Sequence, residues 1–313
     1  MSAAGPPAAV ARRIARGPRP RRTLLPHGLL LPTLLVLVLA LGYPLVRQVV
    51  LSFQEYGLAQ QFGRPAEWVG LRNYRELVGD PYLWTVVLRS LMFCLVNATL
   101  TMTLGVAVAL LMRQLSGPVR VLVQAGLLLA WAMPVLAVLT VWQWLFDTQY
   151  GVVNWLLARA GLDYAGHSWL IDPLSFYLVA TIVVVWMSVP FVAFTLYAGL
   201  TQVAEDTIEA AQLDGAGRWQ RFRHVMVPTV RPILLLVGLL QVIWDMRVFT
   251  QIFVLQQAGG ISRETNLLGT YVYRLGIAEG RFGMAAAVAM FMLALMVLLT
   301  GGYIRVMLRQ EEL

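Results

Sequence analysis

The sequence predicts an all-α polytopic membrane protein with six transmembrane helices, and three observations carry that prediction. Apolar residues make up 59% of the 313 positions and charged residues only 13%, with a mean hydropathy of +0.70. A soluble domain has roughly 25% charged and 45–50% apolar residues. Six apolar stretches are long enough to cross a bilayer, and the arginines between them are unequally distributed. The chain therefore needs lipid as its solvent.

Each of the six predicted spans has at least the ~20 mostly apolar residues that a helix needs to cross the hydrocarbon core. They cover residues 28–51, 84–112, 121–146, 174–200, 233–255 and 284–307. Several arginines precede the first span, as in a secretory signal. Its apolar run exceeds the roughly 7–15 residues of a signal core and has no clear small-x-small cleavage site. We expect it to be retained as a span.

The arginine distribution orients these spans. With a cytoplasmic N-terminus, the inner segments hold 14 arginines and the outer segments seven, which is the asymmetry of the positive-inside rule. Both termini are therefore predicted to be cytoplasmic. The predicted organisation is a basic cytoplasmic tail over residues 1–25 and a six-helix transmembrane domain over residues 26–313, which includes a cytoplasmic loop over residues 201–232.

The residue inventory excludes several kinds of chemistry. All 24 basic residues are arginine, so the lysine of a phosphate-binding P-loop is missing. The single cysteine, Cys94, supports no disulfide within the chain. His27, His167 and His224 are scattered, with no pair at the spacing of a helical metal site. We expect no catalytic residue, no metal site and no enzyme activity. Nucleic-acid binding is not expected either, because the positive charges flank apolar spans.

The cytoplasmic segment EDTIEAAQLDGAGRWQRFRHVMVPTVRP is predicted to form a short helix, a turn and a second helix. Asp206 or Thr207 is a suitable N-cap for the first helix. Gly215 permits a tight reversal, and Pro228 and Pro232 are expected to end the second helix before the next span. From charge and amphipathicity alone, the segment also fits an amphipathic helix lying on anionic lipid.

The string EAAQLDGAG, followed by Phe222, Val225, Pro228 and Pro232, resembles the EAA signature of ABC importer permeases. The resemblance implies a type I ABC importer permease-like fold in the bacterial cytoplasmic (inner) membrane. It also implies that the first loop helix docks, as a coupling helix, on a separate ATPase. The implied docking residues are Glu209, Ala210, Ala211, Asp214 and Gly215. ATP and Mg²⁺ would be bound by that partner, and this chain would need no cofactor.

The resemblance covers nearly the whole chain. The segments EWVGLRNYRELVGDPYLW and WAMPVLAVLTVWQWLFDTQYGVVNWLL, and the late stretch 244–287, are similar to carbohydrate-uptake permeases of the maltose and glycerol-phosphate type. The implied partners are a second permease subunit, an ATPase dimer, an extracytoplasmic solute-binding protein, membrane lipid and a sugar substrate. The chain departs from the family pattern at two positions: Ile261 stands where a proline is usual, and Thr250 stands where an aspartate is common. These departures concern the substrate and the loop geometry that the resemblance implies, and not the class of subunit.

Ionisable residues within a span are costly and usually face a partner or a wet pathway. Asp245 and Arg247 fall in the fifth predicted span, two residues apart, so they do not face each other. Each is expected either to contact the solute or to pair with a separate structural partner.

The family resemblance places sugar contacts on the fourth and fifth spans. The matching positions are Trp186, Ser188, Phe191, Gln241 and Asp245. Aromatic faces stack on sugar C–H surfaces, while carboxylates and amides hydrogen-bond hydroxyl groups. For the aromatic residues, packing within the membrane is the alternative role.

Two other function classes compete with an ATP-driven importer. An ion-gradient-driven secondary transporter would use Asp245 and Arg247 as intramembrane coupling residues, and an inverted repeat would support it. No convincing repeat is found in the sequence. An integral membrane enzyme is disfavoured, because no carboxylate pair, histidine cluster or nucleophile constellation gathers at one membrane depth.

Overall fold

The computed structural model describes residues 25–311 and divides the chain into two units, residues 1–47 and 48–313. The described part of the first unit comprises α1 (Leu25–Leu37), the π-helical turn η1 (Val38–Gly42) and the start of α2 (Tyr43–Ser52). Its side chains from Leu30 onward are almost all exposed, as expected of an apolar helix that faces lipid. The predicted basic tail lies outside the described residues apart from Leu25.

Six membrane-spanning segments are confirmed if one broken helix is counted as a single span. Five helical segments are long and apolar enough to cross a membrane: Leu30–Ser52, Pro81–Gln114, Pro173–Leu200, Arg218–Gln257 and Phe282–Arg305. The predicted span 121–146 is instead a pair, α6 (Gly117–Ala132) and α7 (Val135–Leu145), bent by 100°. The break falls at Met133, whose backbone is extended (ψ 135°), because a following proline disfavours the helical conformation.

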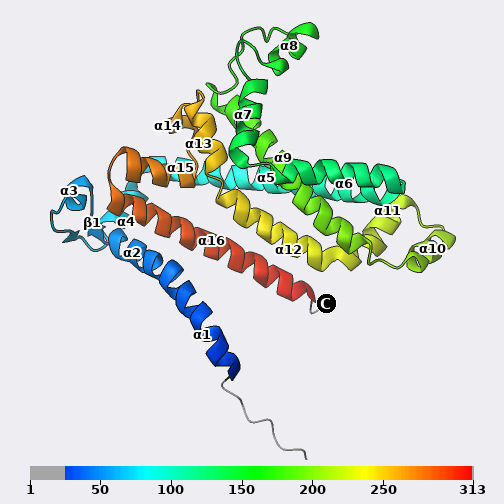
Figure 1. Cartoon of the computed structure of the whole chain (residues 1–313), viewed down its shortest axis with the longest axis horizontal. Coiled ribbons are helices and arrows are strands. Elements are labelled where there is room, and N and C mark those ends of the chain that lie inside the picture. The colour runs from blue at the N-terminus through cyan, green and yellow to red at the C-terminus, as the bar shows by residue number, and fades with distance from the viewer. Residues whose placement is uncertain (1–24, 312–313) are drawn as a thin grey trace, which may run out of the picture. The chain divides into compact units, whose positions relative to one another are not determined.

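The core of the second unit is a bundle around α5 (Pro81–Gln114) and α9 (Pro173–Leu200), which run side by side in the same direction (Figure 1). Phe93 packs with the start of α9 in one apolar cluster, and Ala109 packs with its end in another. The two helices approach closely at Gly105, where an added Cβ would lie 2.4 Å from Val192 Cγ1. Small residues at such crossings let membrane helices pack without a hydrophobic driving force.

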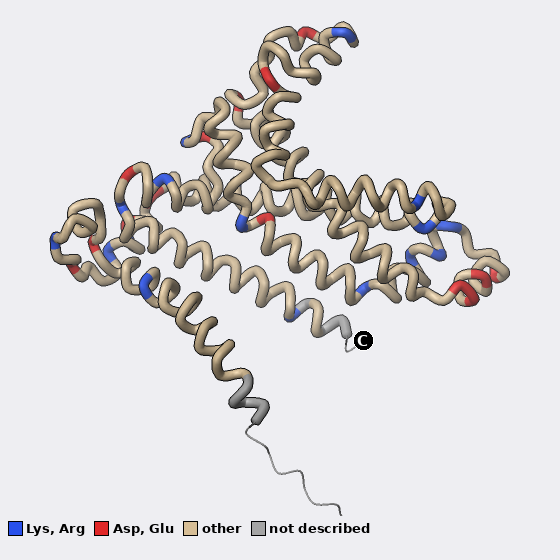
Figure 2. Tube along the Cα trace, viewed as in Figure 1, with Lys and Arg blue, Asp and Glu red and all other residues tan. Residues whose placement is uncertain are grey.

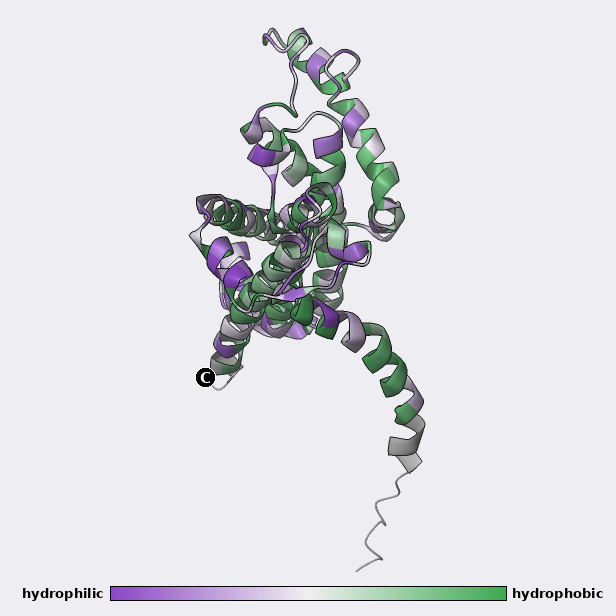
Figure 3. Cartoon of the chain, turned by 90° about the vertical axis from the view of Figure 1, so that its left-hand side faces the viewer, coloured by the Kyte–Doolittle hydropathy of each residue, from purple (hydrophilic) through white to green (hydrophobic). Residues whose placement is uncertain are grey.

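Two further long helices, α12 (Val227–Met246) and α16 (Phe282–Glu311), pack antiparallel to each other. The Tyr303 hydroxyl of α16 donates to the Leu235 carbonyl of α12 over 2.8 Å. At the opposite end, Met246 and Val288 share an apolar cluster. Hydrophobic residues predominate along the long helices (Figure 3), and many of their large side chains are exposed, which fits a protein whose outer surface meets lipid.

Short elements connect the long helices. Strands β1 (Gln54–Glu55) and β2 (Glu67–Trp68) pair antiparallel. The short helices are α3 (Leu58–Gln61), α4 (Arg72–Gly79), α8 (Val152–Arg159), α10 (Glu205–Leu213), α11 (Arg218–Arg221), α13 (Thr250–Gln257), α14 (Ser262–Thr265) and α15 (Leu268–Tyr273), with π-helical turns η2 (Phe222–Met226) and η3 (Arg274–Ala278).

Two local predictions for the loop 201–232 were wrong. Helix α10 begins after Ala204, so Asp206 and Thr207 lie inside its first turns and do not cap it. Helical backbone also continues from α11 through η2 into α12, past both Pro228 and Pro232. The wider π-helical turn directly before Pro228 relieves the clash between a proline ring and the preceding carbonyl groups. A proline kink is tolerated in membrane helices because neighbouring groups satisfy the freed carbonyl.

Candidate functional site

The predicted docking loop forms a compact helical turn at one end of the bundle (Figure 1). Helix α10 closes with a Schellman motif, in which Ala216 N–H donates to the Ala211 carbonyl (2.9 Å) and Gly215 N–H donates to the Gln212 carbonyl (3.1 Å). Gly215 has φ +84° and nothing within 4 Å of an added Cβ. Glycine is therefore favoured there by backbone conformation and not by space.

The candidate docking residues all lie on this turn. Glu209, Ala210, Asp214 and Gly215 are exposed, and Ala211 is half-buried. One side of α10 is anchored by Ile208, which packs on the apolar cluster formed by the ends of α5, α9 and α12. The neighbouring Leu213 is 89% exposed. The opposite side of α10 is thus an exposed surface with negative charge and a large apolar side chain.

The charges of this loop are segregated. Carboxylates gather on α10, whereas arginines lie on α11 and at the adjoining ends of α5 and α6 (Figure 2). Within the described part of the chain, the carboxylates of Glu209 and Asp214 form no ion pair. The link between the two short helices is instead the bond from Arg221 Nη1 to Gln212 Oε1, 2.9 Å long. The exposed face of α10 is therefore complementary to a cationic groove.

An open cavity of about 460 Å³ lies between α6, α9 and the region where α12 meets α13. Ser188, Phe191 and Asp245 line it, so the structure brings three of the five substrate-pathway candidates together. Phe191 is flanked by two tryptophan rings, with centroids 4.9 Å away at Trp244 and 6.2 Å away at Trp131. The cavity therefore combines aromatic faces with a carboxylate and a hydroxyl group.

Asp245 is the most constrained residue of this cavity. It is 2% exposed, and its Oδ1 accepts a 2.9 Å hydrogen bond from Nε2 of Gln241, one helical turn earlier and 1% exposed. Asp245 Oδ2 and Gln241 Oε1 have no hydrogen-bond partner among the described residues. Buried polar atoms without partners are uncommon in native proteins, and here both belong to one side-chain pair beside a cavity.

The other two candidates do not line this cavity. Gln241 lies behind Asp245 as its hydrogen-bond donor. Trp186 packs edge-on against Trp142, with ring centroids 6.0 Å apart, in the cluster around Phe146. Arg247 is exposed at the C-terminal end of α12 and lines the cavity. No ion pair between the described residues includes Arg247 or Asp245.

The sequence-based prediction missed several residues that line the cavity, among them Trp131, Trp244 and Gln251. Trp244 and Gln251 lie on either side of the break at residues 247–249, between α12 and α13, and Trp131 lies just before the bend between α6 and α7. The signal for Trp131 was its position three residues before Pro134 in a predicted span. Helix breaks within membrane proteins expose backbone groups and occur where they line a cavity.

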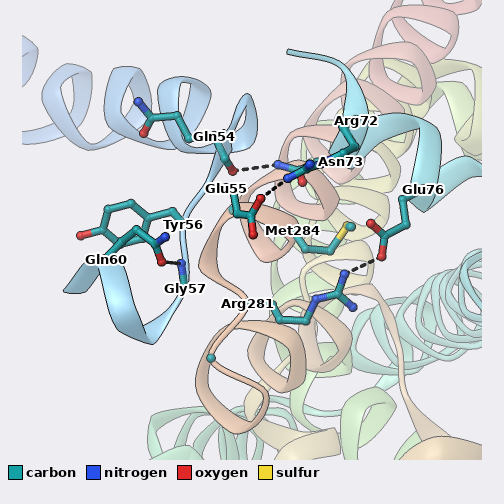
Figure 4. A pocket seen from close by; sticks show the side chains of 12 residues that line it. Gln54, Glu55, Tyr56, Gly57, Gln60, Arg72, Asn73, Glu76, Arg281 and Met284 are labelled. Atoms are coloured by element: carbon teal, nitrogen blue, oxygen red, sulfur yellow. Dashed lines mark hydrogen bonds and ion pairs between the residues drawn. The ribbon is translucent and has the colours of Figure 1, made fainter. Parts of the chain in front are cut away.

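A second polar cavity, of about 430 Å³, lies at the start of α16 (Figure 4), at the end of the bundle opposite the docking loop (Figure 1). Arg72 on α4 pairs with Glu55 on β1, and Arg281 pairs with Glu76 across 2.5 Å. Gly283 fits closely beneath β1, since an added Cβ would lie 2.2 Å from the Gln54 carbonyl oxygen. The side chains of these ion pairs are about half-exposed, so each pair contributes little to the free energy of unfolding. Their main effect is to hold the segments around the cavity in position.

Metal chemistry was not expected from the sequence. Among residues 25–311, no group of three or more histidine, cysteine, aspartate or glutamate side chains gathers in a metal-binding arrangement.

The chain has the polytopic helical fold of known ABC transporter chains. A chain in the crystal structure of a bacterial ABC transporter involved in the import of the acidic polysaccharide alginate superposes with a TM-score of 0.78 at 21% identity, covering 92% of this chain and 96% of that one. A second structure, of the alginate transporter with an alginate pentasaccharide-bound periplasmic protein, gives a TM-score of 0.77 at 21% identity over 90% and 93%.

Residues 101–308 match the family described as the binding-protein-dependent transport system inner membrane component. The diacetylchitobiose uptake system permease protein of Streptomyces coelicolor is 43% identical over 92% of this chain and 88% of its own length. The trehalose/maltose transport system permease protein of Thermococcus litoralis is 31% identical over 76% and 79%. The chain belongs to this family of inner-membrane transport components, and it is a multi-pass permease subunit of an ABC importer.

Proposed function

We propose that this chain is the permease subunit through which a bacterial ABC importer moves a sugar or oligosaccharide across the cytoplasmic membrane. It would act with a second permease subunit, an ATPase dimer that binds ATP and Mg²⁺, and an extracytoplasmic solute-binding protein. The relatives named for diacetylchitobiose and for trehalose/maltose uptake support a sugar substrate. Family membership favours this function over an ion-gradient-driven transporter.

The observation that carries the proposal is the exposed face of α10. Its glutamate, alanines, aspartate and glycine stand in the order of the EAA signature, on a turn held rigid by the Schellman motif. Helix α10 lies at the N-terminal side of α11, η2 and α12, a continuous helical segment that ends beside the cavity. Glu209 would pair with a cationic group of the ATPase, and Gly215 would allow close backbone approach.

We propose the cavity around Phe191 and Asp245 as part of the solute path. Its 460 Å³ lies within the roughly 300–1,000 Å³ of small-molecule sites. The rings of Trp131 and Trp244 offer faces for the C–H surface of a sugar, and the free Asp245 Oδ2 can accept from a hydroxyl group. The polar end shown in Figure 4 is the surface that we assign to docking of the solute-binding protein.

The proposed arrangement in the membrane has both termini in the cytoplasm, residues 1–25 as a basic tail, and residues 26–313 as the six-helix permease domain with the coupling loop over 201–232. This arrangement puts α10 and the ATPase on the same side.

The decisive experiment is reconstitution of the chain with the products of its neighbouring genes. Glu209→Ala should weaken ATPase docking roughly tenfold or more, because a hydrogen bond to a charged group contributes about 1.5–3 kcal/mol. Membrane abundance should not change, since Glu209 is exposed. Glu264→Ala, at an exposed glutamate on α14, is the matched control and should leave ATP-dependent uptake intact. Normal uptake and normal ATPase stimulation in Glu209→Ala would refute the coupling role.

A further inference from the structure

A third cavity, of about 600 Å³, lies where the end of α5 meets the loop helices α10 and α11. It is distinct from the exposed face of α10 that carries Glu209. Its walls include the apolar side chains of Leu110, Ile208 and Phe222, and the ring of Trp219, which is 67% exposed. Charged groups also line it, and they come from two segments that are far apart in the sequence.

Those charged groups are all arginines: Arg113 in the last turn of α5, and Arg218 and Arg221 on α11. No carboxylate lines the cavity, and none of these arginines belongs to an ion pair among the described residues. Arg113 Nη1 and Arg221 Nε are buried atoms without an acceptor in the same part of the chain. Arg221 Nη1 donates to Gln212 Oε1, and the donors of Arg113 and Arg221 that remain without an acceptor form a site for a phosphate or carboxylate group.

The depth of the cavity identifies the source of that anion. No charged residue lies between Arg89 and Arg113 on α5, and the helical rise separates the two by about 36 Å. The hydrocarbon core is about 30 Å thick, so the Arg113 guanidinium reaches the headgroup layer while Leu110, one turn earlier, borders the acyl chains. A free phosphate would contact the arginines but not the apolar wall. A phospholipid would contact both, the arginines through its phosphate group and the apolar wall through its acyl chains.

We infer that this cavity binds the phosphate headgroup of an anionic phospholipid. The phosphate accepts hydrogen bonds from Arg113 and Arg221, and the glycerol and upper acyl carbons lie against Leu110 and Phe222. Basic pockets between membrane helices are suited to such headgroups. The lipid joins the end of α5 to the docking loop, so the position of α10 depends on lipid composition. Lipid binding itself does not require the proposed ATPase partner.

The test uses the full chain purified in a neutral detergent, with native mass spectrometry as the readout. Wild-type protein should retain phosphatidylglycerol about tenfold more strongly than phosphatidylcholine of the same acyl composition. The double variant Arg113→Gln/Arg221→Gln should lose that preference. Arg223→Gln/Arg231→Gln removes two exposed arginines that do not line the cavity and should keep the preference within about twofold. Soluble glycerol phosphate, added as a separate arm, should not compete at equal concentration.

A second measurement needs no arginine variant and therefore covers the case in which the double variant does not fold. Phosphatidylglycerol with brominated acyl chains should quench part of the wild-type tryptophan fluorescence, and Trp219→Phe should remove that part. Equal retention of the two lipids by wild-type protein would overturn the inference, as would equal losses in the two double variants. Competition by glycerol phosphate would indicate a site for soluble phosphoryl compounds. If Arg113→Gln/Arg221→Gln lost ATPase binding but retained phosphatidylglycerol as the wild-type protein does, the inference would be overturned, and the two arginines would instead contact the ATPase.

Discussion

The pairing of Gln241 with Asp245 leads to a prediction about both stability and transport. Asp245→Asn keeps the shape of the side chain, and its amide oxygen can still accept from Gln241 Nε2, now 2.9 Å from Asp245 Oδ1. No cation among the described residues is left unpaired by this change. We therefore expect the free energy of unfolding to change by less than about 1 kcal/mol, while solute uptake weakens or changes its preference.

Removing the hydrogen-bond donor Gln241, by contrast, should lower the free energy of unfolding. Gln241→Leu leaves both carboxylate oxygens of a 2% exposed aspartate without a partner, which should cost about 1–3 kcal/mol. Replacing both residues with leucine removes the unsatisfied group as well as the donor, and such apolar replacement is close to neutral. The double variant should therefore be more stable than the sum of the single changes predicts, with a coupling energy of about 1 kcal/mol or more.

The assay is a double-mutant cycle on the detergent-solubilised chain, with unfolding followed by tryptophan fluorescence, together with uptake by the reconstituted complex. A loss of about 3–5 kcal/mol in Asp245→Asn would refute the reasoning, because that is the effect of breaking a buried ion pair. Wild-type uptake in a stable Asp245→Asn variant would remove Asp245 from the solute path.

The other predictions concern topology and helix packing. Reporter fusions after Leu313 should be cytoplasmic and fusions within 149–172 extracytoplasmic, and a periplasmic C-terminus would contradict the arginine count. Gly105→Ala should lower the free energy of unfolding by about 1–3 kcal/mol, because the new Cβ would lie 2.4 Å from Val192. Gly126→Ala on α6, where nothing lies within 4 Å, is the control and should be neutral or slightly stabilising. Equal stabilities of the two variants would show that the α5–α9 contact is not close.

The number of spans could be predicted from sequence because hydropathy depends on length and composition, which the chain itself contains. Hydropathy does not predict whether a span is one straight helix or two helices joined by a bend. Residues 121–146 have the composition of one helix, yet the chain turns by 100° at Met133 and Pro134. Pro190, by contrast, lies inside the continuous α9, and Pro232 inside α12. Whether a proline breaks a membrane helix depends on neighbouring elements that can satisfy the freed carbonyl groups.

The candidate site was predicted only in part for a related reason. Gln241 and Asp245 are four residues apart, which is the separation at which side chains on one helix face meet. Their hydrogen bond could therefore have been predicted from sequence, whereas we expected Asp245 to contact either the solute or a separate structural partner. Trp186 was assigned to the pathway with Phe191, but it packs away from the cavity against Trp142. Whether the Trp186 side chain faces the cavity depends on its packing against α7, and the local sequence does not contain that information.

The continuity of the helical segment from Arg218 to Met246 suggests how the docking loop and the cavity are connected under the proposed function. One end of this segment follows the turn at Gly215, and the other end carries Trp244 and Asp245 into the cavity wall. Across the cavity, Phe191 belongs to α9, a different helix. A helix is stiff along its axis because each turn is hydrogen-bonded to the next. A displacement of α10 would therefore move Trp244 relative to Phe191 without a separate relay, and the break at residues 247–249 would let α12 move while α13 remains packed against α7 and α9.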